Sequence, residues 1–161
     1  MKIRKATKKD ISELWPLEVE DRKYYKKLIG KKYAKLDKSR IGRKEKEEFI
    51  KNLGKDIKKN LILVIEDKKN IVGYIEGHIT RWKWTDCKNV RLVYIENIAV
   101  SKNYRRKGLG TKLIRGLEKW AKSKKCFGIS LAVLTKNLPA INLYKQNKFY
   151  NHSVYMVKRV K

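Results

Sequence analysis

Hydrophobic residues along this chain follow two spacings, one typical of strands and one typical of helices. Alternating or β-branched apolar runs predict strands, and these fall at 3–6, 61–65, 71–79, 90–100, 127–134 and 153–160. Apolar residues three and four positions apart predict helices, and these fall at 10–29, 45–59, 111–124 and just after Asn137. The resulting order is β-α-α-β-β-β-α-β-α-β. It predicts an α/β (α+β) fold with a single domain over residues 1–161.

Polar residues at the ends of these segments predict how they begin and turn. Asp10 is expected to cap the first helix, with Glu13 three positions on completing a capping box. The residues 67–70 are expected to turn one strand back onto the next as a hairpin. Asn137 is expected to cap the last helix, whose first turn tolerates Pro139.

A basic loop with two glycines joins the strand 90–100 to the helix that follows. It runs Arg105, Arg106, Lys107, Gly108, Leu109, Gly110, Thr111. Glycines let the backbone approach a ligand closely, and the free N–H groups at a helix start attract anions. The three cations add full positive charges. The sequence therefore predicts a loop that binds phosphate.

Two common phosphate-binding motifs fit this loop poorly. A P-loop has its lysine before the Ser/Thr, whereas Thr111 here precedes Lys112. A dinucleotide fingerprint has a third glycine three positions after Gly110, where this chain has Leu113. What remains is Arg-x-x-Gly-x-Gly, from Arg105 to Gly110.

This pattern resembles the pyrophosphate-binding loop of the GNAT acetyltransferase superfamily, which binds acetyl-coenzyme A (acetyl-CoA). The order of elements and the segment from Asn137 to Tyr144, followed by Phe149, resemble the same superfamily. The resemblance implies a mixed, mostly antiparallel central sheet flanked by helices. One departure is Lys148, where the family usually has glycine; Asn147 is expected to adopt the left-handed conformation instead.

The resemblance also implies which residues bind the co-substrate. The loop from Arg105 to Thr111 would hold the pyrophosphate, Asn137 the pantetheine amides, and Ala140 would leave room for the pantetheine arm. The remaining contacts would come from the strand before the loop, namely Ile98, Ala99 and Val100, and from Tyr144. The backbone N–H groups of that strand would polarise the thioester carbonyl. No metal is implied.

Catalysis by this family requires a base for the amine and a proton for the departing thiolate. Tyr144 is the candidate general acid, because it lies four residues after Ala140 on the same helix face. Glu96 is the candidate base, acting through a water just before an expected strand bulge. His78, near the end of the preceding strand, is the rival base. Each also has a structural interpretation, as a core tyrosine, a neutralised carboxylate or a structural histidine.

The charge of the chain is +27, from 43 Lys/Arg against 16 Asp/Glu. Residues 101–161 contain a single acid, Glu118. Such a field steers anions toward the site, and both coenzyme A and nucleic acid are candidates. Enrichment in lysine also arises from host composition, so charge alone names no partner. Trp82 and Trp84 are candidates to line an acceptor pocket, to stack on a base or to cover the core.

The acceptor is expected to be an amine, and a protein α-amine or lysine ranks first by resemblance to the N-terminal and ribosomal-protein acetyltransferases. A polyamine, amino acid or antibiotic is the alternative. A polycation would need a local acidic pocket, for which Glu18, Glu20 and Asp21 are the candidates. A basic nucleic-acid-binding module without catalysis is a further, less favoured alternative.

The remaining expectations concern location and assembly. No run reaches the roughly 20 apolar residues of a membrane span, and the first residues lack the apolar stretch of a signal peptide. A cytoplasmic location is expected on this basis. A homodimer is compatible with the sequence, which leaves the oligomeric state open.

Overall fold

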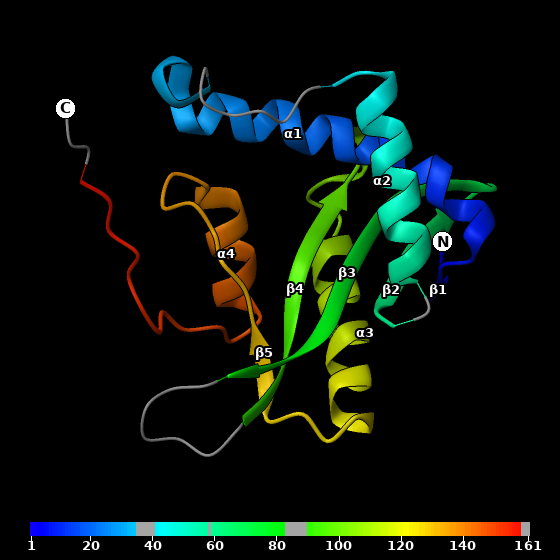
Figure 1. Ribbon diagram of the computed structural model, residues 1–161. Helices are drawn as coiled ribbons and strands as arrows, with labels where there is room; N and C mark the ends of the chain where they lie inside the picture. Colours follow the sequence, from blue (N-terminus) through cyan, green and yellow to red (C-terminus); the bar gives the residue numbers. More distant parts are fainter. Residues whose placement is uncertain (35–40, 58, 83–89, 159–161) are drawn as a thin grey trace.

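The computed structural model describes residues 1–34, 41–57, 59–82 and 90–158, which form a five-stranded sheet with helices on both faces (Figure 1). The strands follow one another in the order of the chain, antiparallel except for the last pair. They are β1 (Lys2–Lys5), β2 (Leu61–Asp67), β3 (Asn70–Trp82), β4 (Val90–Val100) and β5 (Gly128–Ser130). The helices are α1 (Ile11–Ala34), α2 (Arg43–Asp56), α3 (Leu109–Ser123) and α4 (Leu138–Gln146), with short 3₁₀ turns η1 (Lys8–Asp10) and η2 (Lys102–Tyr104).

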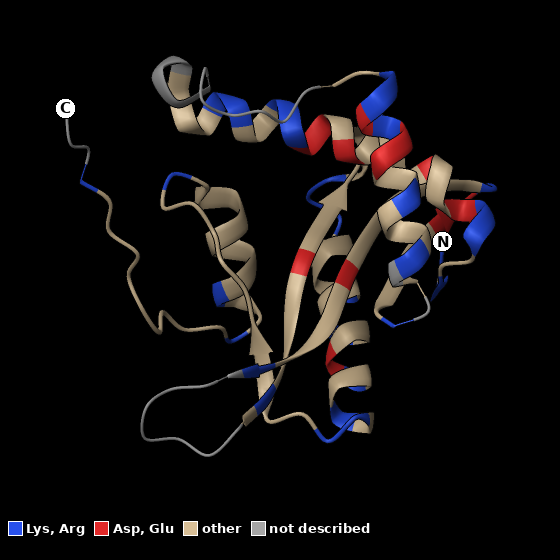
Figure 2. Cartoon of the chain, viewed as in Figure 1, with Lys and Arg blue, Asp and Glu red and all other residues tan. Residues whose placement is uncertain are grey.

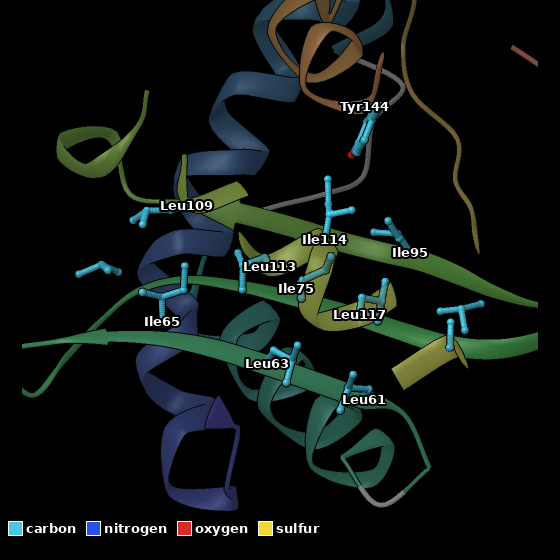
Figure 3. Close-up of a cluster of buried hydrophobic side chains, with 13 residues drawn as sticks. Leu61, Leu63, Ile65, Ile75, Ile95, Leu109, Leu113, Ile114, Leu117 and Tyr144 are labelled. Atoms are coloured by element: carbon cyan, nitrogen blue, oxygen red, sulfur yellow. The ribbon is translucent and has the colours of Figure 1, made fainter. Parts of the chain in front are cut away.

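The alternation along β2 divides the core into two halves, because successive side chains of a strand point to opposite faces. Leu61, Leu63 and Ile65 pack with the buried face of α3 (Figure 3). Ile62 and Val64 pack on the other face with α1 and α2. The predicted apolar faces of the helices are confirmed, since Leu113, Ile114 and Leu117 of α3 are buried and Leu53 of α2 is buried with Phe49 packed beside it.

The hairpin and the long strand are also confirmed. β2 turns into β3 through Lys68 and Lys69, both with positive φ. This is the backbone conformation of the tight turns that match the twist of a hairpin. β4 then pairs with β3 along its whole length, from Val90 opposite Trp82 to Val100 opposite Gly73.

A bulge interrupts the pairing of β3 with β4 at Glu96. Glu76 pairs with Asn97 and Gly77 pairs with Ile95, so Glu96 is the extra residue on β4. The sequence prediction placed the bulge just after Glu96, and the structure places it on that residue. A bulge redirects the side chains that follow it. Glu96 and Asn97 consequently line the same cavity although they are neighbours in sequence.

The start of the first helix differs from the expected capping box. Thr7, not Asp10, precedes the helical segment, and Asp10 occupies the third position of its first turn. The Thr7 backbone N–H and hydroxyl donate to Asp10 Oδ2 at 2.6 and 2.8 Å. Arg4 also donates to both Asp10 oxygens, at 2.7 and 2.9 Å. The box is thus shifted by three residues, because Arg4 on β1 draws the Asp10 carboxylate back toward the sheet.

Two predicted strand segments are wrong within the described residues. β5 ends at Ser130, because its pairing with β4 ends at Tyr94 opposite Ser130, so residues 131–134 are not strand. Residues 151–158 form no strand either, and their side chains are exposed, as for Tyr155 at 93%. Their composition favours a strand, but a strand also needs an edge to pair with. The end of the predicted strand, 159–160, lies outside the described residues.

In the part of the chain that the structure describes, no helix is both long enough and apolar enough to cross a membrane.

Candidate active site

The predicted phosphate-binding loop lies at the start of α3. Gly108 is the residue before the helix and has a φ of 73°, in the left-handed region that favours glycine. The first helical hydrogen bond runs from Lys112 N to Gly108 O at 3.1 Å. The N–H groups of residues 109–111 therefore precede the first helical bond. They are the groups that an anion meets at a helix start.

The cations of the loop are held by specific contacts. Arg105 Nε donates to the Val100 carbonyl at 2.9 Å, and its Nη2 lies 3.4 Å from Glu20 Oε2. The Lys102 N–H also donates to Glu20, at 3.1 Å. The Lys107 ammonium lies 5.2 Å from the Tyr104 ring centroid, a cation–π distance. Glu20 of α1 is therefore part of this site, which no local sequence pattern indicates, because 85 residues separate it from Arg105.

Helices α3 and α4 are in direct contact beside the loop. A Cβ on Gly110 would lie 2.8 Å from Leu143 Cδ2, so a larger residue there would require the Leu143 side chain to move. Asn147 Nδ2 donates to the Thr111 hydroxyl at 3.2 Å and to the Leu143 carbonyl at 2.8 Å. The structure thus brings the predicted loop and the predicted tyrosine helix together.

The two ends of α4 show how the sequence specifies it. Asn137 caps the helix as predicted, with Oδ1 accepting from Ala140 N at 3.3 Å. At the other end the expectation for Asn147 is wrong, because its φ is −96° and Lys148 takes the left-handed conformation with a φ of 65°. Lys148 stands where the family pattern has glycine, so the geometry is retained without the residue that favours it.

Tyr144 points from α4 toward the sheet and is only 9% exposed (Figure 3). Its ring lies 5.6 Å from that of Phe149 in an edge-on arrangement. Burial, and then the nearby Asp21 and Tyr94, raise the pKa of Tyr144 to about 12. The phenol therefore keeps its proton at neutral pH, as a hydrogen-bond donor or general acid must. Burial also raises the pKa of Asp21, with Glu18 adding to the shift.

The two rival bases form a pair. His78 Nδ1 lies 3.4 Å from Glu96 Oε1, and the His78 ring lies 5.6 Å from that of Tyr94. About half of the Glu96 side chain is exposed, at 49%. The sequence treated His78 and Glu96 as alternatives, and the structure places them side by side because β3 and β4 are neighbours.

The edge of β4 beyond Tyr94 completes the arrangement. Its pairing with β5 stops at Tyr94, so residues 95–100 have no strand on that side within the described ranges. Ile98 and Val100 pack toward the α3 face, whereas Ala99 is buried on the α1 face. The backbone groups along this edge are not used by a sheet partner in the described part of the chain.

A cavity of about 340 Å³ lies between α1, α2 and the strands β3 and β4. Glu96 lines it together with acidic residues of the other three elements, and Figure 2 shows acidic positions on all four. The full lining is Glu18, Arg22, Glu48, Phe49, Asn52, Leu53, Asn60, Glu76, Glu96 and Asn97. Of the three acids expected to form a local pocket, only Glu18 lines this cavity.

The two tryptophans expected to line an acceptor pocket, stack on a base or cover the core have side chains outside the described part of the structure. Trp82 ends β3, and Trp84 lies outside the described residues, so the structure describes neither side chain. Among the described residues, no group of three or more His, Cys, Asp or Glu side chains could hold a metal ion.

Comparison with known proteins identifies the family. The acetyltransferase (GNAT) family model matches residues 21–149. The chain therefore belongs to this family, which confirms the resemblance seen in the sequence.

Individual relatives match over shorter stretches. Streptothricin acetyltransferase of Escherichia coli is 41% identical over 81 residues, which cover 50% of this chain and 42% of the relative. An N-alpha-acetyltransferase of Sulfurisphaera tokodaii is 36% identical over 91 residues, covering 53% of this chain and 54% of the relative. The chain thus spans about half the length of the curated relatives it matches.

Solved structures support the fold. A mutant of the BH1408 protein from Bacillus halodurans has a TM-score of 0.85 and 19% identity, with both chains covered in full. This similarity confirms the predicted mixed α/β fold with a central sheet flanked by helices.

Proposed function

We propose that this chain is an acetyl-CoA-dependent N-acetyltransferase that passes the acetyl group directly to an amine while both substrates are bound. The observation that carries the proposal is the contact of α3 with α4. The start of α3 carries free N–H groups with basic side chains beside them, and the adjoining α4 carries the buried Tyr144 phenol. Membership of the family supplies the reaction class.

In this proposal the start of α3 binds the pyrophosphate of acetyl-CoA. The N–H groups of Leu109, Gly110 and Thr111 face the anion, and Arg105, Arg106 and Lys107 add positive charge. Gly108 leaves open space in front of them, since a Cβ there would meet no atom within 4 Å.

The acetyl end of the co-substrate then lies between β4 and α4. The free edge formed by Ile98, Ala99 and Val100 offers backbone donors to the pantetheine and the thioester carbonyl. Asn137 and Ala140 line the same arm from α4. The Asn137 amide oxygen already accepts from Ala140 N, so its amide nitrogen is the group that can donate to the pantetheine.

The chemistry needs protons to leave the nitrogen and one to reach the sulfur. A charged amine loses one proton to Glu96, directly or through a water, before its nitrogen attacks the thioester carbon, and it loses a second to solvent through the same route as the amide forms. The carbon–sulfur bond then breaks, and Tyr144 donates its proton to the departing thiolate. His78 contacts Glu96 at 3.4 Å and offers a second acceptor for the amine proton.

Two more specific proposals concern the class of acceptor and the cellular location of the protein. An amine acceptor follows from the activity, and a protein α-amine or lysine was ranked first from the sequence. The matched relatives include one named for an antibiotic and one named for an α-amine, so they support either kind. A cytoplasmic location, a homodimer and the less favoured nucleic-acid alternative stay predictions.

Isothermal titration of acetyl-CoA into the protein tests the proposal. Binding to the unaltered chain, abolished by Gly108→Glu, is the expected result, because the new carboxylate would stand where the pyrophosphate binds. Gly30→Glu is a control for adding a carboxylate at a glycine of positive φ (77°) with open space around it, away from the loop. Absence of binding to the folded, unaltered protein would refute the acetyltransferase proposal, and nucleic acid would be tested next.

A further inference from the structure

The cavity beside Glu96 has a charge opposite to that of the molecule. The chain as a whole is +27, yet four of its 16 acidic residues line this one space. They come from four different elements, as Glu18 of α1, Glu48 of α2, Glu76 of β3 and Glu96 of β4. Arg22 is the single basic residue in the lining. The lining therefore has four formal negative charges and one positive charge.

The carboxylate deepest on the α1 side is fixed by the fold. Glu18 is 8% exposed, and its Oε2 accepts from the Tyr74 hydroxyl at 3.0 Å and from Asn97 Nδ2 at 2.7 Å. Its Oε1 accepts from Arg22 Nε at 2.6 Å, and Arg22 in turn lies 5.3 Å from the Trp15 ring centroid. Buried charge is costly unless it is paired, and here the guanidinium of Arg22 is engaged by Glu18.

The other carboxylates are distributed from the interior to the surface. Glu76 is 8% exposed and accepts from Asn60 Nδ2 at 3.1 Å, whereas Glu48 and Glu96 are exposed. These four side chains do not converge, because no group of three or more acidic or other ligating residues in the described chain could hold a metal ion. Carboxylates that are spread apart suit an extended molecule with separate positive charges better than a single ion.

The volume is sufficient for a small molecule. A cavity of about 340 Å³ lies within the range for small-molecule sites, roughly 300 to 1,000 Å³. The net charge of the chain is strongly positive and repels a cationic acceptor, whereas the acidic lining of this cavity attracts it. An acceptor with several positive charges is therefore drawn to this cavity.

We propose, on the basis of the acetyltransferase function proposed above, that the acceptor is a small molecule with at least two positively charged amines. One amine lies at Glu96, where it loses its proton and is acetylated. The second remains charged and binds at the exposed Glu48, with the partnered carboxylates Glu76 and Glu18 behind it adding to the negative potential. The distal carboxylates thus select the substrate, and Glu96 acts on the selected amine.

Steady-state kinetics with two acceptors of equal length test this proposal. The acceptors are 1,5-diaminopentane and 5-amino-1-pentanol, which replaces the second amine by an uncharged hydroxyl. A neutral peptide with a free α-amine represents protein acceptors. Release of the coenzyme A thiol is measured for each. We expect kcat/KM for the diamine to exceed that of the amino alcohol by about tenfold or more, mainly through KM.

A pair of variants on one helix locates the effect. Glu48→Gln should reduce the preference for the diamine to about threefold or less, mainly by raising the KM for the diamine. Glu48 is exposed, so the variant retains the fold. Glu47→Gln is the control, because Glu47 is also exposed on α2 but pairs with Arg43 and does not line the cavity. Higher salt should narrow the preference of the unaltered enzyme, because it screens exposed charges.

The failures of the two proposals are distinguishable. If acetyl-CoA binds but the amino alcohol or the peptide is acetylated as efficiently as the diamine, the diamine acceptor is refuted and the acetyltransferase stands. A preference for the diamine that survives Glu48→Gln refutes the role of the distal carboxylates. Absence of acetyl-CoA binding refutes both proposals.

Discussion

Tyr144 shows how burial prepares one side chain for a chemical role. The phenol is 9% exposed and its pKa is raised to about 12, so it remains protonated across the range in which enzymes are assayed. A raised pKa of this kind favours the neutral form in the folded protein. The stability linked to it is complete below pH 10, the usual pKa of tyrosine, and is lost as the pH rises through about 12.

Replacing Tyr144 by phenylalanine tests its role as a proton donor. The ring contact with Phe149 is kept and only the hydroxyl is lost. We expect kcat to fall by about 10²-fold or more while the KM for acetyl-CoA stays within about twofold. Tyr150→Phe, at an 81% exposed position, is the control. An unchanged kcat in Tyr144→Phe would assign the phenol to the core alone.

Asp10 provides a pH-dependent contribution to stability. Hydrogen bonds from Arg4 hold the pKa of the Asp10 carboxyl well below its usual range, and the Thr7 contacts add to the shift. A lowered pKa contributes stability above the unfolded value, near 3.9, and the contribution is lost as the pH falls through the folded value. Asp10→Asn should therefore unfold more easily at pH 7, by about 2 kcal/mol, with a gap that narrows below about pH 4.

Urea unfolding of both proteins at pH 7 and pH 3 measures this gap. The exposed pair of Arg43 with Glu47 gives the control, since Glu47→Gln should produce no comparable gap at either pH. A gap of equal size at both pH values would show that Asp10 stabilises the fold through packing and not through its charge.

At the scale of elements, α4 is followed by one residue, Lys148, in an unfavourable backbone conformation. Lys148 has a φ of 65°, while its N–H donates to the Lys145 carbonyl at 3.0 Å and Phe149 N donates to the Tyr144 carbonyl at 3.0 Å. A left-handed conformation costs a residue with a Cβ about 1 kcal/mol or more. The helix end therefore keeps its hydrogen bonds at the expense of backbone strain.

Lys148→Gly should raise the free energy of unfolding by about 1 kcal/mol, because glycine adopts this conformation freely. Lys145→Gly is the matched control within the same helix, where glycine should lower the stability by a similar amount. Denaturant titration of both variants measures these changes in the free energy of unfolding. If Lys148→Gly is also destabilising, the Lys148 side chain contributes more than its backbone costs.

The elements also show which sequence patterns are sufficient to predict a strand or a helix. β2, β3 and α3 were predicted because their apolar patterns alone require a buried face. The segments 131–134 and 153–160 have similar composition, but a strand exists only where a neighbour offers an edge. β5 reaches only Ser130 along β4, and residues 151–158 have no strand partner among the described residues. Whether a segment finds a strand edge to pair with depends on the whole sheet, so a local pattern of apolar residues does not predict it.

At the scale of the whole molecule, the candidate site was predicted in part. The loop from Arg105 to Thr111 and the helix with Tyr144 are contiguous motifs, so the sequence identified them. The cavity was predicted only through Glu96 and Glu18, because its acids are 20 to 30 residues apart, and no pattern marks Glu48 or Glu76. The bulge at Glu96 decides which way that side chain and Asn97 point, and a one-residue change of register cannot be read from composition.

The whole molecule also separates charges of opposite sign. Residues 101–161, which hold the proposed phosphate-binding loop, contain one acid, whereas the acids of the cavity come from residues 18–96. Under the two proposals, an anionic co-substrate and a cationic acceptor would be attracted to different parts of the chain. The acidic cavity would then bind a polycation that the net positive charge otherwise repels.

The contact of Gly110 with Leu143 affects how far apart two parts of the candidate site lie. A methyl group on Gly110 would displace the Leu143 side chain, and Asn147 joins the same two helices through a hydrogen bond to Thr111. Packing thus contributes to the separation between the helix start and the Tyr144 phenol. If both bind one thioester carrier as proposed, we expect a carrier with a shorter or longer arm to reach only one of them. Discrimination among carriers then depends on their length, even where their chemical groups are the same.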